Sequence, residues 1–253
     1  MRRLTHNRRP AFLYPDSLKE LDEYRIPINR KIAEDVERVQ YLNRENCNYF
    51  HFPADSDKVV ILLHGGAWVG GDASELLFLK DLFSEHHVVC AGYTRLTDEP
   101  YTMEGCVSSI IELIDHVKFN ICENIYLIGH SAGGHLAAYC STQRELAGVG
   151  IISAPLLLHN SSIRRNMGVQ YPDQDFSPYY PGHNKPLTDN ILFLRGDHEF
   201  HLHEHIATLK QDWGVPVKYV VPYDTDHFNI LMSILEKTKT YKAIKELIDG
   251  QST

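Results

Sequence analysis

Two hydrophobic patterns alternate along this sequence: short continuous runs of Val, Ile and Leu, and longer segments with apolar residues at helical spacing. Runs that are apolar at every position are typical of parallel strands buried on both faces. Strands are predicted at 59–63, 87–92, 124–128, 149–153, 191–194 and 217–221. Helices are predicted at 75–84, 103–117, 135–142, 204–213 and 229–248.

This alternation predicts an α/β protein with a doubly wound, mostly parallel sheet and helices on both faces, built as one domain over residues 1–253. Two weaker segments, 39–42 and 49–52, are expected as antiparallel edge strands. Segment 155–188 is rich in Pro and aromatic residues and has little periodicity. A long irregular stretch of this kind predicts a lid or pocket wall, with an ordinary surface excursion as the alternative.

Composition and charge narrow the class of protein. The chain has a formal net charge of −8, which argues against a nucleic-acid partner. Its one basic cluster, four arginines among the first nine residues, is expected to be a solvated terminus. No apolar run approaches the ~18 residues that span a bilayer, and residues 1–10 lack the apolar stretch of a secretory signal. No membrane association is therefore expected. Five cysteines without metal-ligand spacing indicate reduced thiols and a cytoplasmic location.

The most informative motif is Gly129-His130-Ser131-Ala132-Gly133, which falls between a predicted strand and a predicted helix. In that context the pattern G-x-S-x-G predicts a nucleophile elbow, a strained turn that raises the Ser131 hydroxyl above the end of the sheet. Side chains in place of Gly129 and Gly133 would collide with the neighbouring strand and helix. A simple tight turn is the alternative, because the pentapeptide also occurs by chance.

A second glycine-rich segment, 64–68, reads HGGAW and directly follows the strand at 59–63. Acyl transfer needs two or more backbone N–H groups aimed at the oxyanion beside the nucleophile. Gly65, Gly66 and Ala132 are predicted to supply them, because glycine lets the backbone approach the substrate and Ala132 follows the serine. Ala67 is a further candidate, and a mere glycine turn is the alternative.

The predicted general base is His227, because the hydrolase order of Ser, then acid, then His puts the base after the last strand. The acid is expected after the strand at 191–194, where two carboxylates compete. Glu199 is favoured because it stands three residues after Gly196, whereas Asp197 is the alternative because Asp is the commoner acid. Three other aspartates are weaker alternatives: Asp189, Asp224 and Asp226.

Several histidines surround this acid and raise the question of a metal site: His198, His201, His203 and His205. Ser131 and its partners nevertheless form a complete acyl-transfer apparatus that needs no metal. We therefore expect a solvated histidine-rich loop, with no metal and no cofactor.

Taken together, these motifs resemble those of the esterase/lipase branch of the α/β-hydrolase superfamily, and within it the kynurenine formamidase (arylformamidase) group. The resemblance rests on segments 64–68 (HGGAW), 129–136 (GHSAGGHL), 196–199 (GDHE) and 227–230 (HFNI), with 166–168 and 177–178 in the insert. The acid is Glu where that group usually has Asp. The resemblance implies the α/β-hydrolase fold and the cleavage of a small carboxylic ester or aryl formamide.

The expected activity is that of a serine hydrolase in which Ser131 attacks a small-molecule ester or amide, His227 takes its proton, and Glu199 orients the imidazole. Three aromatic residues are interpreted as pocket wall or, equally, as core: Trp68, Tyr171 and Tyr179. Two other functions are weighed: a serine peptidase, and a non-catalytic ligand-binding protein on a hydrolase scaffold. The pattern gives no prediction of the oligomeric state.

Overall fold

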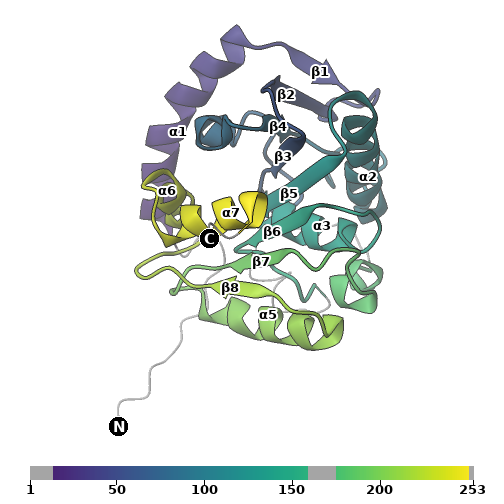
Figure 1. Cartoon of the computed structure of the whole chain (residues 1–253), viewed down its shortest axis with the longest axis vertical. Coiled ribbons are helices and arrows are strands. Elements are labelled where there is room, and N and C mark those ends of the chain that lie inside the picture. Colours follow the sequence, from purple (N-terminus) through teal and green to yellow (C-terminus); the bar gives the residue numbers. More distant parts are fainter. Residues whose placement is uncertain (1–13, 159–174, 251–253) are drawn as a thin grey trace.

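The computed structural model describes residues 14–158 and 175–250. Within these residues lies an eight-stranded sheet with the order β1-β2-β4-β3-β5-β6-β7-β8 (Figure 1). The strands are β1 (Arg38–Gln40), β2 (Asn48–Phe52), β3 (Lys58–Leu63), β4 (His87–Ala91), β5 (Asn124–His130), β6 (Gly148–Ile152), β7 (Ile191–Leu194) and β8 (Lys218–Val220).

Strands β3 to β8 pair in parallel, whereas β1 and β2 are antiparallel edge strands, as the sequence predicts. The central strands are buried along almost their whole length, which explains their continuous apolar composition. Strand β3 pairs with β4 on one side and β5 on the other. The chain therefore changes direction across the sheet at β3, and in such sheets the crevice at the carboxyl ends of these strands is the usual ligand site.

Helices cover both faces of the sheet (Figure 1). On one face, α2 (Met103–Asn120), α3 (Ala132–Cys140) and α5 (Phe200–Trp213) contribute to one hydrophobic cluster. On the other face, a second cluster contains side chains of α1 (Pro15–Asp35), the 3₁₀ helix η2 (Leu77–Phe83), α6 (Asn229–Leu235) and α7 (Lys239–Asp249). The predicted doubly wound α/β architecture is thus confirmed.

The predicted helix at 229–248 is wrong in one respect, because the structure divides it into α6 and α7. Lys237 has a left-handed backbone with φ of 53°, which ends the first helix. Thr238 then begins the second helix as its N-cap, since its side chain accepts a hydrogen bond from the N–H of Thr240. The segment predicted as a helix at 75–84 forms the shorter 3₁₀ helix η2.

Segment 155–188, predicted as a lid or pocket wall, is described only at its two ends, because 159–174 lie outside the described residues. Its second half contains two short 3₁₀ helices, η3 (Ser177–Tyr179) and η4 (Pro181–His183). This half is tied to α5, because the indole N–H of Trp213 donates to the carbonyl of Pro181 at 3.0 Å. Among the described residues, no helix has the length and apolar character needed to cross a membrane.

Candidate active site

Ser131 lies in a tight turn between the end of β5 and the start of α3, at the middle of the sheet. Its backbone has φ of 54° and ψ of −120°, a conformation that costs a non-glycine residue about 1–3 kcal/mol. The turn also brings backbones into contact: a Cβ on Gly129 would lie 2.2 Å from the Gly133 carbonyl oxygen, and one on Gly133 would lie 2.4 Å from that of His64. The sequence argument that both positions require glycine therefore holds.

The structure brings Ser131, His227 and Glu199 together from three separate segments. His227 Nε2 lies 3.0 Å from Ser131 Oγ, and His227 Nδ1 lies 2.7 Å from Glu199 Oε1. An ionised carboxylate only accepts hydrogen bonds, so Nδ1 holds the imidazole proton and Nε2 is left to accept the serine proton. This is the arrangement that turns a serine hydroxyl into a nucleophile.

Glu199 is completely buried and makes three hydrogen bonds. Besides His227, the Ser153 hydroxyl donates to Oε2 at 2.5 Å and the Gly196 N–H donates to it at 2.8 Å. Burial by itself would raise the pKa of Glu199, but the charge of a protonated His227 and the three donated hydrogen bonds lower that pKa to about 2. The carboxylate therefore stays ionised at every pH at which the protein is expected to work.

The rival carboxylates have other partners. Asp197 accepts hydrogen bonds from the N–H groups of Asp224 and Thr225 at 2.9 and 2.8 Å, so it shapes the loop that leads to His227. Asp226 accepts from the N–H groups of Phe228 and Asn229 at the start of α6, at 2.9 and 3.0 Å. The structure thus gives the contact with the imidazole to Glu199, whereas Asp197 and Asp226 accept from backbone N–H groups of the loop around His227.

The glycine-rich segment after β3 lies directly beside Ser131. A Cβ on Gly65 would be 3.0 Å from Ser131 Cβ, and Gly66 has φ of +105°, which only glycine adopts without strain. The carbonyl of Gly65 accepts a hydrogen bond from His64 Nδ1 at 2.6 Å, and the Tyr93 hydroxyl donates to the His64 carbonyl at 3.0 Å. These contacts fix the peptide planes of the loop whose N–H groups are the oxyanion-hole candidates.

Ala132 completes this candidate oxyanion hole. It is the first residue of α3, and the N–H groups in the first turn of a helix have no partner within the helix. The N–H of Ser131 itself donates to the Ile152 carbonyl at 2.8 Å and is engaged in the sheet. Donors for a substrate oxygen are therefore expected from Gly65, Gly66 and Ala132.

The three aromatic residues interpreted as pocket wall have different surroundings. Trp68 is only 1% exposed and packs edge-on against His135 in the core, with ring centroids 5.4 Å apart, so its surroundings match the core alternative. Tyr179 is half-buried, packs against Tyr139 at 5.7 Å, and accepts a hydrogen bond from His135 Nε2 through its carbonyl. Tyr171 lies outside the described residues.

The start of α1 and the residue before it, Tyr14, contact the loops that contain Glu199 and His227, a feature that the sequence reasoning missed. The Tyr14 hydroxyl donates to the carbonyl of His198 at 2.9 Å, next to the acid, and the Ser17 hydroxyl donates to Asp226, next to the base. Burial and the charges of Glu199 and Asp226 raise the pKa of Tyr14 to about 12. No sequence motif marks these contacts, because they depend on how α1 docks.

The histidines near Glu199 do not gather into a metal site in the described part of the chain. There, the one group of three or more ligand-type side chains is Glu85, His86 and Asp249, which includes none of Ser131, His227 and Glu199. Lys245 pairs with both carboxylates of this group, at 2.7 Å for Asp249, and His86 Nε2 lies 2.8 Å from Asp249. These contacts make the cluster an ion-pair network in which Lys245 already supplies a cation.

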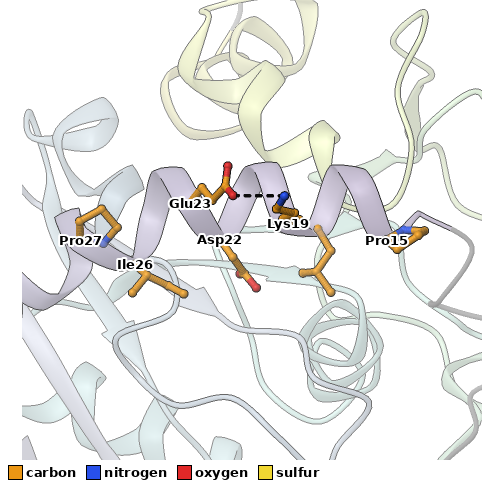
Figure 2. Close-up of a pocket in the computed structure, with 7 residues that line it drawn as sticks. Pro15, Lys19, Asp22, Glu23, Ile26 and Pro27 are labelled. Atoms are coloured by element: carbon orange, nitrogen blue, oxygen red, sulfur yellow. Dashed lines mark ion pairs between the residues drawn. The ribbon is translucent and has the colours of Figure 1, made fainter.

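A separate open groove of about 510 Å³ runs along α1 (Figure 2). Its described lining comes entirely from that helix, and Lys19 and Glu23 form an ion pair there at 3.6 Å. Ser17, which contacts the triad loop, is not among these lining residues. The groove and the triad are therefore lined by different residues.

The sheet order, the elbow after β5, and the Ser–acid–His order after β5, β7 and β8 together define the α/β-hydrolase fold. Comparison with known families agrees: the family model described as BD-FAE matches residues 50–162, which include the glycine-rich loop and the elbow.

Solved structures of esterases are also similar over most of the chain. Thermogutta terrifontis esterase 2, phosphoramylated by tabun, is 16% identical with a TM-score of 0.67, covering 86% of this chain and 96% of its own. EstE5 soaked with p-nitrophenyl butyrate is 17% identical with a TM-score of 0.69, covering 91% of each chain. An arylesterase is 17% identical with a TM-score of 0.66, covering 94% and 99%. At these identities the likeness establishes the fold.

Proposed function

We propose that this protein is a serine hydrolase that cleaves small carboxylic esters through an acyl-enzyme on Ser131. The observation that supports this most directly is the continuous chain of contacts from Ser131 Oγ to His227 at 3.0 Å and on to Glu199 at 2.7 Å. A scaffold that had lost its catalytic function would have no need to keep three side chains from separate segments within hydrogen-bonding distance of one another. The BD-FAE match and the esterase neighbours favour an ester as the substrate.

In the first half of the reaction, Ser131 Oγ attacks the carbonyl carbon while His227 Nε2 takes the hydroxyl proton. The carbonyl oxygen becomes an oxyanion, to which the N–H groups of Gly65, Gly66 and Ala132 donate. Each such donor is typically worth about 3 kcal/mol of transition-state stabilisation. His227 then gives its proton to the leaving alcohol, and the acyl group remains on Ser131.

In the second half, a water molecule replaces the alcohol and the same steps run in reverse. His227 takes a proton from water, the resulting hydroxide attacks the acyl carbon, and Ser131 regains its proton as the acid is released. Glu199 keeps the imidazole in one tautomer and stabilises its charged form throughout. Its pKa of about 2 suits this role, because the carboxylate never needs to accept the proton itself.

An aryl formamide is the second candidate substrate, favoured by the HGGAW and GHSAGGHL segments that resemble those of kynurenine formamidases. We would measure kcat/KM for p-nitrophenyl acetate and for N-formylkynurenine on one preparation, with Ser131→Ala as the blank. We expect ester turnover that disappears in the Ser131→Ala variant while the melting temperature stays within about 2 °C. A strong preference for the formyl amide would assign the formamidase reaction. Undiminished turnover in Ser131→Ala would contradict the proposal.

A further inference from the structure

His130, the residue before the nucleophile, makes a contact that the catalytic mechanism does not use. Its side chain is buried with 5% exposure, and its Nε2 lies 2.7 Å from the backbone carbonyl oxygen of His227. A carbonyl oxygen only accepts hydrogen bonds, so Nε2 carries a proton and donates it. The two imidazole rings lie 4.9 Å apart at an angle of 48°. His130 is therefore bonded to the main chain of the general base, 97 residues away in the sequence.

We propose that His130 is a positioning residue that sets the place of His227 relative to Ser131, an inference that rests on the proposed function. His227 belongs to a loop, where no strand pairing fixes its peptide. His130, by contrast, is the last residue of β5 and immediately precedes Ser131. One hydrogen bond thus connects the backbone of the base to the rigid strand that presents the nucleophile. Such support matters because a displacement of about 1 Å in an active site costs roughly 100-fold in rate.

The same ring also separates the base from the oxyanion loop. A Cβ on Gly65 would lie 3.2 Å from His130 Nδ1, so the imidazole fills the space between that glycine and the His227 loop. His130 also lines a nearly filled cavity of about 10 Å³, whose other lining residues are mostly leucines and isoleucines. The proton on Nε2 and the lone pair on Nδ1 suit a neutral ring in these surroundings. Burial, together with the neighbouring His227, lowers the pKa of His130 to about 3, which is consistent with that neutral state.

The test compares two replacements that keep a large side chain at this site, since alanine would enlarge the cavity. His130→Gln retains an N–H donor that reaches a similar position, whereas His130→Leu fills the space without a donor. We expect His130→Leu to lower kcat for p-nitrophenyl acetate by about 10- to 100-fold with KM changed less than about threefold. His130→Gln should recover kcat to within about fivefold of the wild type. His86→Leu, which removes another buried histidine away from the triad, should leave kcat unchanged.

A readout without substrate separates this inference from the proposed function. The low-field proton NMR signal of the His227 Nδ1–H bonded to Glu199 should persist in His130→Gln and broaden or vanish in His130→Leu. If the wild type shows that signal with this response but hydrolyses no ester, the proposed function fails and the positioning role stands. If His130→Leu keeps both the signal and kcat, or if His130→Gln is as impaired as His130→Leu, the positioning role is overturned.

Discussion

Seven non-glycine residues of the described chain have left-handed backbone angles, and four of them belong to the nucleophile turn, the glycine-rich segment 64–68 or the contacts of Glu199. Ser131 has φ of 54°, Ser153 has φ of 49°, and Ala67 and Trp68 have φ of 53° and 62°. Three of these residues are held by printed contacts: Ser131 donates its N–H to the Ile152 carbonyl, Ser153 donates to Glu199, and the Trp68 side chain is buried in the core. Strain of this kind persists only where neighbouring contacts determine the conformation, and it concentrates at functional sites.

The acid offers the sharpest prediction at the scale of single residues. Glu199→Gln replaces a buried carboxylate by an amide that cannot stabilise a protonated His227, so we expect kcat to fall by about 100- to 10,000-fold. Asp197→Asn should cost less than about tenfold, because Asp197 accepts from the loop before His227 and lies near His198 but does not contact the imidazole of His227. Steady-state kinetics on p-nitrophenyl acetate would measure both variants. A larger loss in Asp197→Asn than in Glu199→Gln would contradict the assignment of the acid.

Individual residues differ in how far the sequence reveals them. Ser131 is predicted from a short-range signal, the G-x-S-x-G pattern, and His227 is predicted from the order of the strands and of the Ser, acid and His segments along the chain. Ser153 and His130 have no such signal, since their contacts join loops that are far apart in the sequence. Trp68 illustrates the same limit: a Trp beside a glycine loop fits a pocket or a core equally well until its packing is known.

At the scale of elements, the parallel strands were the easiest to predict. Five of them are mostly apolar, and their predicted limits agree with the structure to within about two residues. The helices were harder because their signals are mixed. Helix α3 begins at Ala132, three residues before the predicted start at 135, since Gly133 and Gly134 disguise its first turn.

Helix α1 was missed altogether, although it is 21 residues long. Pro27 lies within it, and a proline in a helical pattern normally indicates a break. The helix is stable because tertiary contacts compensate: the buried Asn29 donates to the Glu75 carbonyl at 3.0 Å and accepts from the Phe78 N–H at 2.8 Å. The helical spacing of Leu21 and Ile28 is a signal from which the helix can be predicted. The docking of the start of α1 against the loops of Glu199 and His227 has no signal in the sequence, because it depends on tertiary contacts.

At the scale of the whole molecule, three histidines that are buried as neutral rings make the free energy of unfolding depend on pH. Burial lowers the pKa of His64 and His135 to about 4 and that of His130 to about 3. In the unfolded chain each would titrate near 6.5, so below that pH the unfolded state binds protons that the folded state does not. The stabilisation is therefore complete above pH about 6.5 and is lost as the pH falls toward the folded-state values.

The expected size of this effect is about 1.4 kcal/mol per histidine for each pH unit between roughly 6 and 4.5. Urea unfolding at pH 7 and pH 5 would measure it, and we expect a clearly lower midpoint at pH 5 with an unchanged slope. Equal midpoints at the two pH values would show that these rings are not held neutral in the fold.

The arrangement of the whole fold explains why the site lies where it does. The elbow after β5 and the glycine loop after β3 meet because these strands are parallel neighbours, and their carboxyl ends share one edge of the sheet. The acid and base follow β7 and β8 and reach the same edge from the other half of the sheet. A single continuous sheet thus brings together groups that are about 100 residues apart in the sequence.

The central claim is that Ser131 is a nucleophile activated by His227, and labelling with diethyl p-nitrophenyl phosphate tests it most directly. Peptide mass spectrometry after incubation should find one diethyl phosphate per chain, on the peptide that contains Ser131, with matching release of p-nitrophenol. The folded His227→Ala variant should be labelled at least about 100-fold more slowly. A wild-type protein that stays unlabelled, carries the adduct at another residue, or reacts no faster than His227→Ala would contradict the claim.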